Sequence, residues 1–557
     1  MICYCAKTDR GGIMKHPDPQ EMNDGVLDHR GEVLPYLSKS AKNMKMDMLL
    51  ETPLPTYEGE TPGSYFWTKV IYWICHRISK VQYRSIEASG MEKIPRDRGS
   101  LCCAWHTNGI LDALQITLNH PEYFVLGARH DLVTRPILGW WTRKMAVQPV
   151  VRKAELLRGG CTEEEANFLN GRSLMTLASG ISHGYGCVLF PEGTSHNNSY
   201  MLRFRTGPMR TVLAASALAK ASDKELPVLI PMGLHFRTRE YFRTDVWVEY
   251  GDPIQVEDND VPQNLVDAVS TGTWSEPPAD SVFKLRDKLR EDLVPLSPNA
   301  HSWEEYRGLL LLGHLNGRLE NNAPKSWREE VEQARFFRNK YSIESKSTDI
   351  DNLQPEKITD DLVSKSEKAA ELLHKNGLDG RDLNTNSTNL AKPKLSKLPF
   401  SAIRISLFTL LLPVFLISLL PQMILGRVLG DSTDEGIDAR TSYQFLAAMF
   451  GSIIIWPLSS TLMVGILYWQ TGTIENILDI RWTEAFGTSE FSVALSICML
   501  WLAMFPISLI TGRLFSLVWD DYVDLRGYIR KIKLPKADRK ELFQIIAEIK
   551  QDLSSSK

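Results

Sequence analysis

The stretch LCCAWHTNGILD, residues 101–112, places a short apolar run directly before a turn that contains glycine. The run at residues 101–105 has the length and composition of a buried strand. Apolar runs of the same kind recur downstream, at residues 123–126, 187–190 and 228–232. Helix-like stretches such as residues 163–182 separate them, and this alternation of strands and helices predicts an α/β domain.

The composition of the 557 residues limits the class of protein. Lys and Arg number 64 and Asp and Glu 67, so the formal net charge of −3 gives no support for a nucleic-acid partner. A hydrophobic share of 43% and a charged share of 24% are globular values, which argue against wholesale disorder. Eight cysteines are too few for a disulfide scaffold, and no cluster of residues shows metal-ligand spacing.

The last third of the chain is strongly apolar. Three segments, residues 405–426, 441–474 and 491–512, contain no charged residue. A bilayer crossing takes about 20 apolar residues, so each segment is long enough. The chain is therefore predicted to be an integral membrane protein.

Charges beside these segments predict their orientation. Cytoplasmic flanks are usually rich in Lys and Arg. Basic residues stand both before residue 405 and after residue 512, whereas the charged residues of 475–490 are mainly acidic. Pro413 and Pro421 favour a bend in the first segment. We therefore expect a body that faces the cytosol, a re-entrant segment at 405–426, and spans at 443–469 and 491–512. Three true spans are the alternative.

His106 and Asp112 are candidates for a catalytic pair. They stand six residues apart, about 240° around a regular helix, so one helix face would not hold both. A turn that runs into a helix start could still bring them together. A neutral histidine beside a carboxylate is a workable general base, because the carboxylate fixes the tautomer and stabilises the imidazolium. The alternative is a purely structural histidine and aspartate.

Residues 190–196, FPEGTSH, follow a predicted strand and indicate a tight turn. Hydroxyls and backbone N–H groups of such a turn can bind an oxyanion, and arginine suits bidentate binding of phosphate. The candidate substrate-binding residues are Arg152, Glu192, Gly193, Thr194, Ser195 and Arg205. The alternatives are an ordinary strand-end turn and solvated surface arginines.

Four blocks in this order resemble the glycerolipid acyltransferase family, which includes lysophosphatidate and glycerol-3-phosphate acyltransferases. His106 and Asp112 match its His–Asp block, and PILGWWTRKMAVQPVVR, residues 136–152, matches a block that ends in arginine. FPEGT with the later residues 205–207 matches the third block, and VLIPMGLHF, residues 228–236, matches the fourth. Five residues separate His106 from Asp112 where the family has four. The longer spacing resembles the fungal-type branch, which acylates glycerol-3-phosphate and dihydroxyacetone phosphate.

The resemblance implies the chemistry of the site. His106 would be the general base, Asp112 would orient it, and the arginines would hold a phosphate. A fatty acyl group would move from acyl-CoA, or alternatively from acyl carrier protein, to a phosphorylated glycerol in phosphatidic acid and phospholipid synthesis. No metal or other cofactor is implied, and the membrane bilayer is the expected partner. Acylation of lysophosphatidate and an inactive membrane scaffold are the alternatives.

The pattern GISHG, residues 180–184, matches the Gly-x-Ser-x-Gly motif of serine hydrolases. That motif needs a strand before the serine and a helix after it. Ser182 is predicted to follow a helix and precede a strand, so a serine nucleophile is not expected there.

The predicted domains follow from these patterns. They are a polar N-terminal arm (1–60), a membrane-surface or core helix (61–82), the acyltransferase domain (83–255), a helical extension (256–345), a polar linker (346–397), the membrane domain (398–519) and a cytosolic basic tail (520–557).

Overall fold

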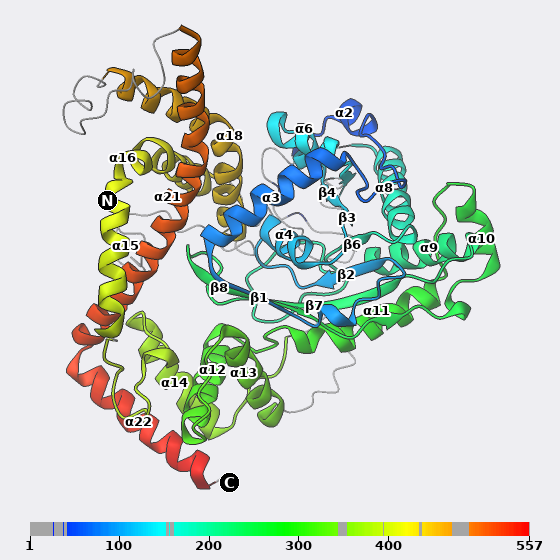
Figure 1. Cartoon of the computed structure of the whole chain (residues 1–557). Coiled ribbons are helices and arrows are strands. Elements are labelled where there is room, and N and C mark those ends of the chain that lie inside the picture. The colour runs from blue at the N-terminus through cyan, green and yellow to red at the C-terminus, as the bar shows by residue number, and fades with distance from the viewer. Residues whose placement is uncertain are drawn as a thin grey trace.

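The computed structural model has a sheet domain, a helical layer and a bundle of long apolar helices (Figure 1). The residues that it describes are 26, 37, 42–151, 155, 161–342, 354–393, 395–433, 437–469 and 490–555.

A mixed sheet, with seven strands in the described residues, forms the centre of the sheet domain. Its order is β1 (Tyr83–Ser89), β8 (Thr244–Tyr250), β7 (Val228–Phe236), β2 (Ser100–Ala104), β6 (Gly186–Val188) and β3 (Phe124–Val125), with β9 (Ile254–Gln255) beside β7. β7 runs antiparallel to β8 and β9, and the other neighbouring pairs are parallel. The predicted α/β fold with a mixed sheet is confirmed.

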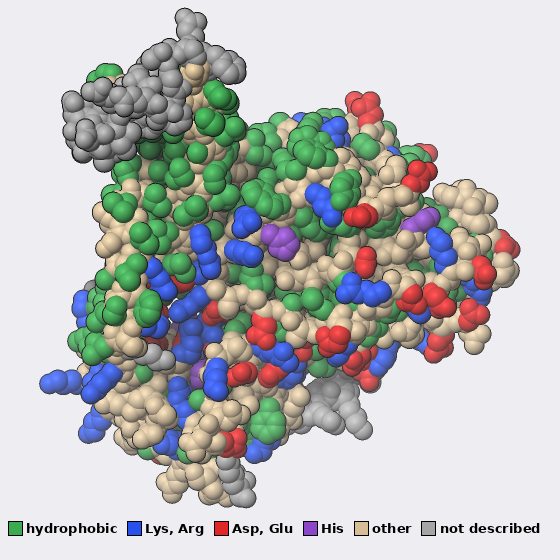
Figure 2. Space-filling view, in the orientation of Figure 1, with side chains coloured by type: hydrophobic (Ala, Val, Ile, Leu, Met, Phe, Trp, Pro, Cys, Tyr) green, Lys and Arg blue, Asp and Glu red, His purple; other side chains and the backbone are tan. Residues whose placement is uncertain are grey.

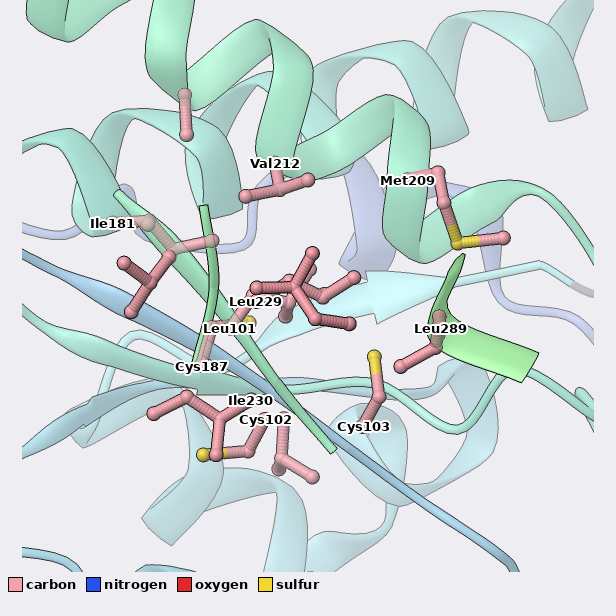
Figure 3. Close-up of a cluster of buried hydrophobic side chains, with 14 of the residues drawn as sticks. Leu101, Cys102, Cys103, Ile181, Cys187, Met209, Val212, Leu229, Ile230 and Leu289 are labelled. Carbon is pink, nitrogen blue, oxygen red and sulfur yellow. The ribbon is translucent and has the colours of Figure 1, made fainter. Parts of the chain in front are cut away.

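The main core is built around this sheet. Every residue of β2 is buried, so its sequence is a continuous apolar run rather than an alternating one. Helices α9 (Gly207–Ala221) and α11 (Ala279–Leu293) contribute Val212 and Leu289, which Figure 3 shows among the side chains of β2 and β7. Helix α10 (Gln263–Ser270) joins the same core. The core therefore extends beyond residue 255, where the sequence analysis ended the acyltransferase domain.

Residues 42–60 differ from the polar arm that the sequence predicted. The short helix α2 (Met46–Leu50) buries Leu49 against Val151 and Leu169. The guanidinium of Arg172 donates hydrogen bonds to the carbonyl oxygens of Leu50 and Thr52, at 2.8 and 2.6 Å. Because Leu169 and Arg172 belong to α8 (Glu163–Ser182), this segment is fixed along that helix.

Helix α3 (Tyr65–Gln82) combines both interpretations of its sequence. One face buries Ile71 and Cys75 in a small core. Another face leaves Tyr65, Phe66 and Trp73 more than half exposed. The helix is thus a core element that also presents aromatic side chains at the surface.

The helical layer has its own core. Its main helices are α12 (Trp303–Leu319), α13 (Trp327–Tyr341), α14 (Asp361–Lys375) and α22 (Lys536–Ser555). The predicted linker 346–397 contributes Val363, Leu373 and Leu383 to this core, all nearly inaccessible to solvent. The described part of that segment is therefore packed structure, because apolar residues spaced along its polar sequence meet helices from distant parts of the chain.

Buried ion pairs join the helical layer to the sheet. Arg335 of α13 binds Glu249 of β8 at 2.6 Å, and Glu330 of α13 binds Arg237 at 2.5 Å. Burial alone would raise the pKa of Glu249, but hydrogen bonds from Arg335 and His235 hold that pKa at about 2. Burial likewise opposes ionisation of Glu330, and hydrogen bonds from Arg237, with His314 Nε2 3.1 Å away, hold its pKa at about 2.

The third part is the bundle of apolar helices. Three helical segments in the described chain are long and apolar enough to cross a membrane, by length and composition: Leu412–Ser432, Ala439–Leu467 and Ser492–Lys533. They belong to the broken helix α15–α17 (residues 398–432), to α18 (Ile437–Trp469) and to α21 (Glu490–Lys533). Figure 2 shows hydrophobic side chains over this bundle, and Lys and Arg side chains where it meets the rest of the molecule. The predicted basic tail begins as a continuation of α21.

The broken helix leaves the sheet-domain end of the bundle and returns to it. Arg404 near its start pairs with Asp521 of α21 at 3.2 Å, and Asp431 at its end pairs with Arg440 of α18 at 2.9 Å. Between them, a π-helical turn at Phe415–Leu419 follows Pro413. A proline inside a helix removes a backbone hydrogen bond and favours a kink. This path is the one expected of a re-entrant segment, and the topology itself stays a prediction.

Candidate active site

The candidate site lies at the carboxyl ends of β2 and β6. These two strands are parallel neighbours, so the loops that follow them meet at one edge of the sheet. The first loop carries residues 105–109 into helix α4 (Ile110–Asn119), and the second carries FPEGTSH. The two motifs are far apart in sequence, and the strand order brings them together.

The first loop brings His106 and Asp112 into contact. His106 Nδ1 lies 2.9 Å from Asp112 Oδ2, which also accepts hydrogen bonds from the backbone N–H groups of Thr107 and Asn108, each at 2.7 Å. Gly109 makes this path possible with φ 53° and ψ −131°, a region that suits glycine. The expected turn into a helix start is present, and the catalytic role of the pair stays a prediction.

The geometry leaves one nitrogen of His106 available. Asp112 is buried and carries the negative charge against Nδ1, which favours the tautomer with a proton on Nδ1. In the part of the chain that the structure describes, no hydrogen bond engages Nε2. The side chain of His106 is 18% exposed, so Nε2 can meet a substrate while the opposite side of the ring stays fixed.

Phe190 fixes the plane of that ring. Its ring stacks on the imidazole of His106 with centroids 4.0 Å apart and an angle of 9° between the planes. Together with the Asp112 contact, this stacking restrains both the direction and the rotation of the imidazole. The FPEGTSH sequence singled out the turn, but nothing in its pattern indicated that Phe190 contacts the histidine.

Glu192, predicted to bind substrate, contacts both loops of the candidate site. Its carboxylate is buried and accepts the backbone N–H of His106 at 2.7 Å and that of Leu202 at 2.7 Å. His196 Nε2 lies 2.6 Å from the same carboxylate. His196 Nδ1 accepts the N–H of Asn198, so Nε2 carries the proton and donates to Glu192. Glu192 therefore links the two loops through both of its oxygens, and substrate binding by this residue stays a prediction.

Arg239 is a site residue that the sequence analysis missed. It follows β7 and donates hydrogen bonds from Nη1 to the carbonyl oxygens of Thr107 and His196, at 2.5 and 3.0 Å. Nη2 donates to Asn197 Oδ1. One guanidinium thus bonds to both loops of the candidate site. The basic character of the segment was visible in the sequence, but no spacing rule pointed to this arginine.

Gly193, Thr194 and Ser195 form a surface turn in the same loop as Phe190, and Arg205 lies next to that turn. Gly193 has φ +70°, and a Cβ there would lie 3.5 Å from Arg205 Cγ, so the turn and Arg205 are adjacent. Gly193 and Arg205 are exposed, and Thr194 and Ser195 are half-buried. The backbone N–H of Arg205 donates to the carbonyl of Pro191 at 2.6 Å. Substrate binding by these residues stays a prediction, and Arg152 lies outside the described residues.

Ser182 does not have the surroundings of a hydrolase nucleophile. It lies in the last turn of α8, before β6, and its Oγ donates to the carbonyl oxygen of Ser179 at 2.8 Å. The order of helix, serine and strand is the reverse of a nucleophile elbow.

Comparisons with known proteins match the region that contains this site. Residues 85–234 match the family model described as Acyltransferase. Glycerol-3-phosphate O-acyltransferase 2 of Saccharomyces cerevisiae is 28% identical over 151 residues, which are 27% of this chain and 19% of that protein. Glycerol-3-phosphate O-acyltransferase 1 of the same yeast is 26% identical over 124 residues, 22% of this chain and 15% of that protein. The matched part of this chain thus spans less than a fifth of each relative.

One solved structure is also similar in part. It is the 1-acyl-sn-glycerophosphate (LPA) acyltransferase PlsC of Thermotoga maritima, with 17% identity over 39% of this chain and 79% of that chain. The TM-score of 0.26 is too low for any conclusion about this chain. The family match covers all residues of the His106–Asp112 pair and of the FPEGTSH turn. Residues 85–234 of this chain are therefore an acyltransferase domain, as the motifs predicted.

Proposed function

We propose that the protein is a membrane-bound O-acyltransferase that moves a fatty acyl group from acyl-CoA to a hydroxyl of glycerol-3-phosphate. The observation that carries the proposal is the His106–Asp112 pair, with Nδ1 held by a buried carboxylate and Nε2 open. The names of the two yeast relatives support glycerol-3-phosphate as the acceptor. Dihydroxyacetone phosphate is an alternative acceptor, and acyl carrier protein is an alternative donor.

The proposed step needs no acyl-enzyme. Nε2 of His106 removes the proton of the acceptor hydroxyl while that oxygen attacks the thioester carbonyl. The tetrahedral intermediate then collapses, the bond from carbon to sulfur breaks, and the thiol leaves with the proton from His106. Asp112 stabilises the imidazolium in between, and the stacked Phe190 keeps Nε2 directed at the acceptor.

Arginine side chains near His106 would bind the phosphate of the acceptor. Arg205 stands beside the Gly193 turn at the surface, where its guanidinium can reach a phosphate. Arg152 is a second predicted phosphate ligand on the basis of the motif alone. The N–H of Gly193 donates to the carbonyl of Phe190 at 3.1 Å, so the backbone N–H of Thr194 is the one that the turn would offer to the phosphate or to the oxyanion of the intermediate.

The protein would work at the cytosolic surface of its membrane. The apolar helices supply the membrane domain, and the basic flanks favour two spans plus a re-entrant segment. This orientation places the acyltransferase domain in the compartment that holds acyl-CoA. Partners are then the bilayer, the thioester and the phosphorylated acceptor.

The test is transfer by the purified full-length protein. Labelled acyl-CoA is offered with glycerol-3-phosphate, dihydroxyacetone phosphate and lysophosphatidate in parallel. His106→Ala should lower kcat about 10²–10⁴-fold, since that is the usual loss for a general base. Asp112→Asn should be similarly damaging. Full activity of His106→Ala would refute the assignment of the base.

The same assay separates the alternatives. Selective use of lysophosphatidate would make the protein a second-step acyltransferase. No transfer to any acceptor would favour a non-catalytic membrane scaffold, although both members of the pair are retained. Labelling by a fluorophosphonate probe that is lost in Ser182→Ala would favour a hydrolase.

A further inference from the structure

The first turns of the membrane helix α18 reach the loop that carries His106. Thr441 Oγ1 donates a hydrogen bond to Asn108 Oδ1 at 2.7 Å, and both side chains are almost completely buried. The next residue, Ser442, accepts the backbone N–H of Ile110 on its Oγ at 3.1 Å. Two consecutive residues of an apolar helix thus contact the loop of His106 and the first residue of α4.

The Ser442 contact supplies a cap that helix α4 lacks. The first N–H groups of a helix have no partner within the helix, and a side chain just before it usually accepts one of them. Gly109 occupies that position in α4 and has no side chain, and no side-chain cap is present there. Ser442 of α18 accepts the N–H of Ile110 instead. Asp112 lies in this same first turn of α4.

The Thr441 contact restrains Asn108, a residue that bonds to Asp112 through its backbone. Asn108 donates its backbone N–H to Asp112 Oδ2, the oxygen that also meets His106 Nδ1. Fixing the Asn108 side chain therefore fixes a peptide group that orients the carboxylate. Asn108 is buried, and Thr441 supplies the hydrogen bond to its Oδ1. Loss of that donor would leave a buried polar atom without a partner, which is destabilising.

Apolar packing next to the two hydrogen bonds also holds α18 against the sheet domain. Phe445 and Met449, one and two turns further along α18, lie in a buried cluster with Leu111 of α4 and Ile71 of α3. On the other side of the bundle, Arg243 pairs with Asp520 of α21 through two hydrogen bonds at 3.0 and 2.6 Å. The apolar bundle is thus attached to the sheet domain at two places.

We propose that Thr441 and Ser442 are positioning residues for acyl transfer. They hold the loop of residues 106–110 and the start of α4, so that Asp112 and His106 keep the geometry of a general base. The membrane helix thereby assists the chemical step in addition to anchoring the protein. This inference rests on the proposed function, because it concerns the rate of that transfer.

The test uses full-length protein in detergent or lipid nanodiscs. Thr441→Val keeps the shape of the side chain and removes its hydroxyl, which leaves Asn108 Oδ1 without its partner. We expect kcat to fall about tenfold, from a lost hydrogen bond to a buried group, while the KM for acyl-CoA stays unchanged. Thr441→Ser, which retains a hydroxyl, should restore most of the rate. Ser442→Ala should lower kcat less, by about threefold.

The matched control is Ser452→Ala. Ser452 lies on the same helix, and among the described residues its hydroxyl bonds only to the carbonyl of Met449, within α18. Wild-type kcat is expected for this variant. Equal rates for Thr441→Val, Ser442→Ala and wild type would overturn the inference alone. An equal loss in Ser452→Ala, or no rescue by Thr441→Ser, would also overturn it, because both point to a general loss of packing. No transfer by wild-type protein to any acceptor would overturn the proposed function itself.

Discussion

Replacement of Glu192 by glutamine separates a structural role of this residue from a substrate-binding role. The carboxylate is surrounded by three N–H donors, from His106, Leu202 and His196. Both of its oxygens accept a hydrogen bond, so either orientation of the glutamine amide turns its NH₂ group toward an N–H donor. The variant loses charge-assisted hydrogen bonds and leaves a buried donor without a partner.

The size of the effect follows from these contacts. A buried polar group without its partner costs about 1–3 kcal/mol, and a hydrogen bond to a charged group contributes about 1.5–3 kcal/mol. We therefore expect Glu192→Gln to lower the free energy of unfolding by about 3 kcal/mol. For a domain of this size that corresponds to a decrease in Tm of about 6–12 °C. Because the His106 backbone loses its anchor, kcat should also fall by about tenfold.

The assay combines thermal unfolding of the detergent-solubilised full-length protein with steady-state kinetics in both substrates. Glu164→Gln is the matched control, because Glu164 is exposed in the first turn of α8. It should leave Tm and kcat unchanged. A Glu192→Gln variant with wild-type Tm and a raised KM for the acceptor alone would refute the structural role. It would support the binding role that the sequence first suggested.

Three further predictions concern binding, pH and topology. Arg205→Ala should raise the KM of the phosphorylated acceptor by about tenfold or more, from the loss of a charge-assisted contact, and an effect confined to the thioester KM would assign Arg205 to the donor. The carboxyls of Glu249 and Glu330 have pKa values held at about 2 in the folded protein, below those of an unfolded chain. Their stabilisation is therefore complete above about pH 5 and decreases as the pH falls toward 2. Tm measured by scanning fluorimetry should accordingly drop between pH 5 and pH 3, and a constant Tm over that range would contradict the pairing. For the two-span topology, a cysteine at Ser489 should react with an impermeant reagent from outside the cytosol, and a cysteine at Ser554 should not; labelling of Ser554→Cys from outside would overturn it.

Local sequence patterns determined the elements and the motif. The apolar run of β2 is continuous because both faces of the strand are buried, and the start of α8 is fixed by the capping box of Thr162 and Glu165. The glycine turn into α4 allowed a contact between His106 and Asp112 six residues apart. These features depend on residues within one or two turns of each other, so composition and spacing are sufficient to predict them.

Contacts between distant segments were decided only by the tertiary structure. The neighbouring positions of β2 and β6 bring Glu192 and Phe190 to His106, across more than 80 residues of sequence. Arg239 joins the same loops from a third segment, and its sequence surroundings resemble those of any surface arginine.

The same limit applies to α18. Hydropathy predicted an apolar helix there, but hydropathy is a property of the helix alone. Thr441 meets Asn108 across 333 residues, and no local pattern records such a pair. Which partner satisfies a buried polar group depends on the path of the whole chain. The sequence therefore indicated His106 and Asp112 as the candidate pair, and only the folded structure showed what holds the two side chains in place.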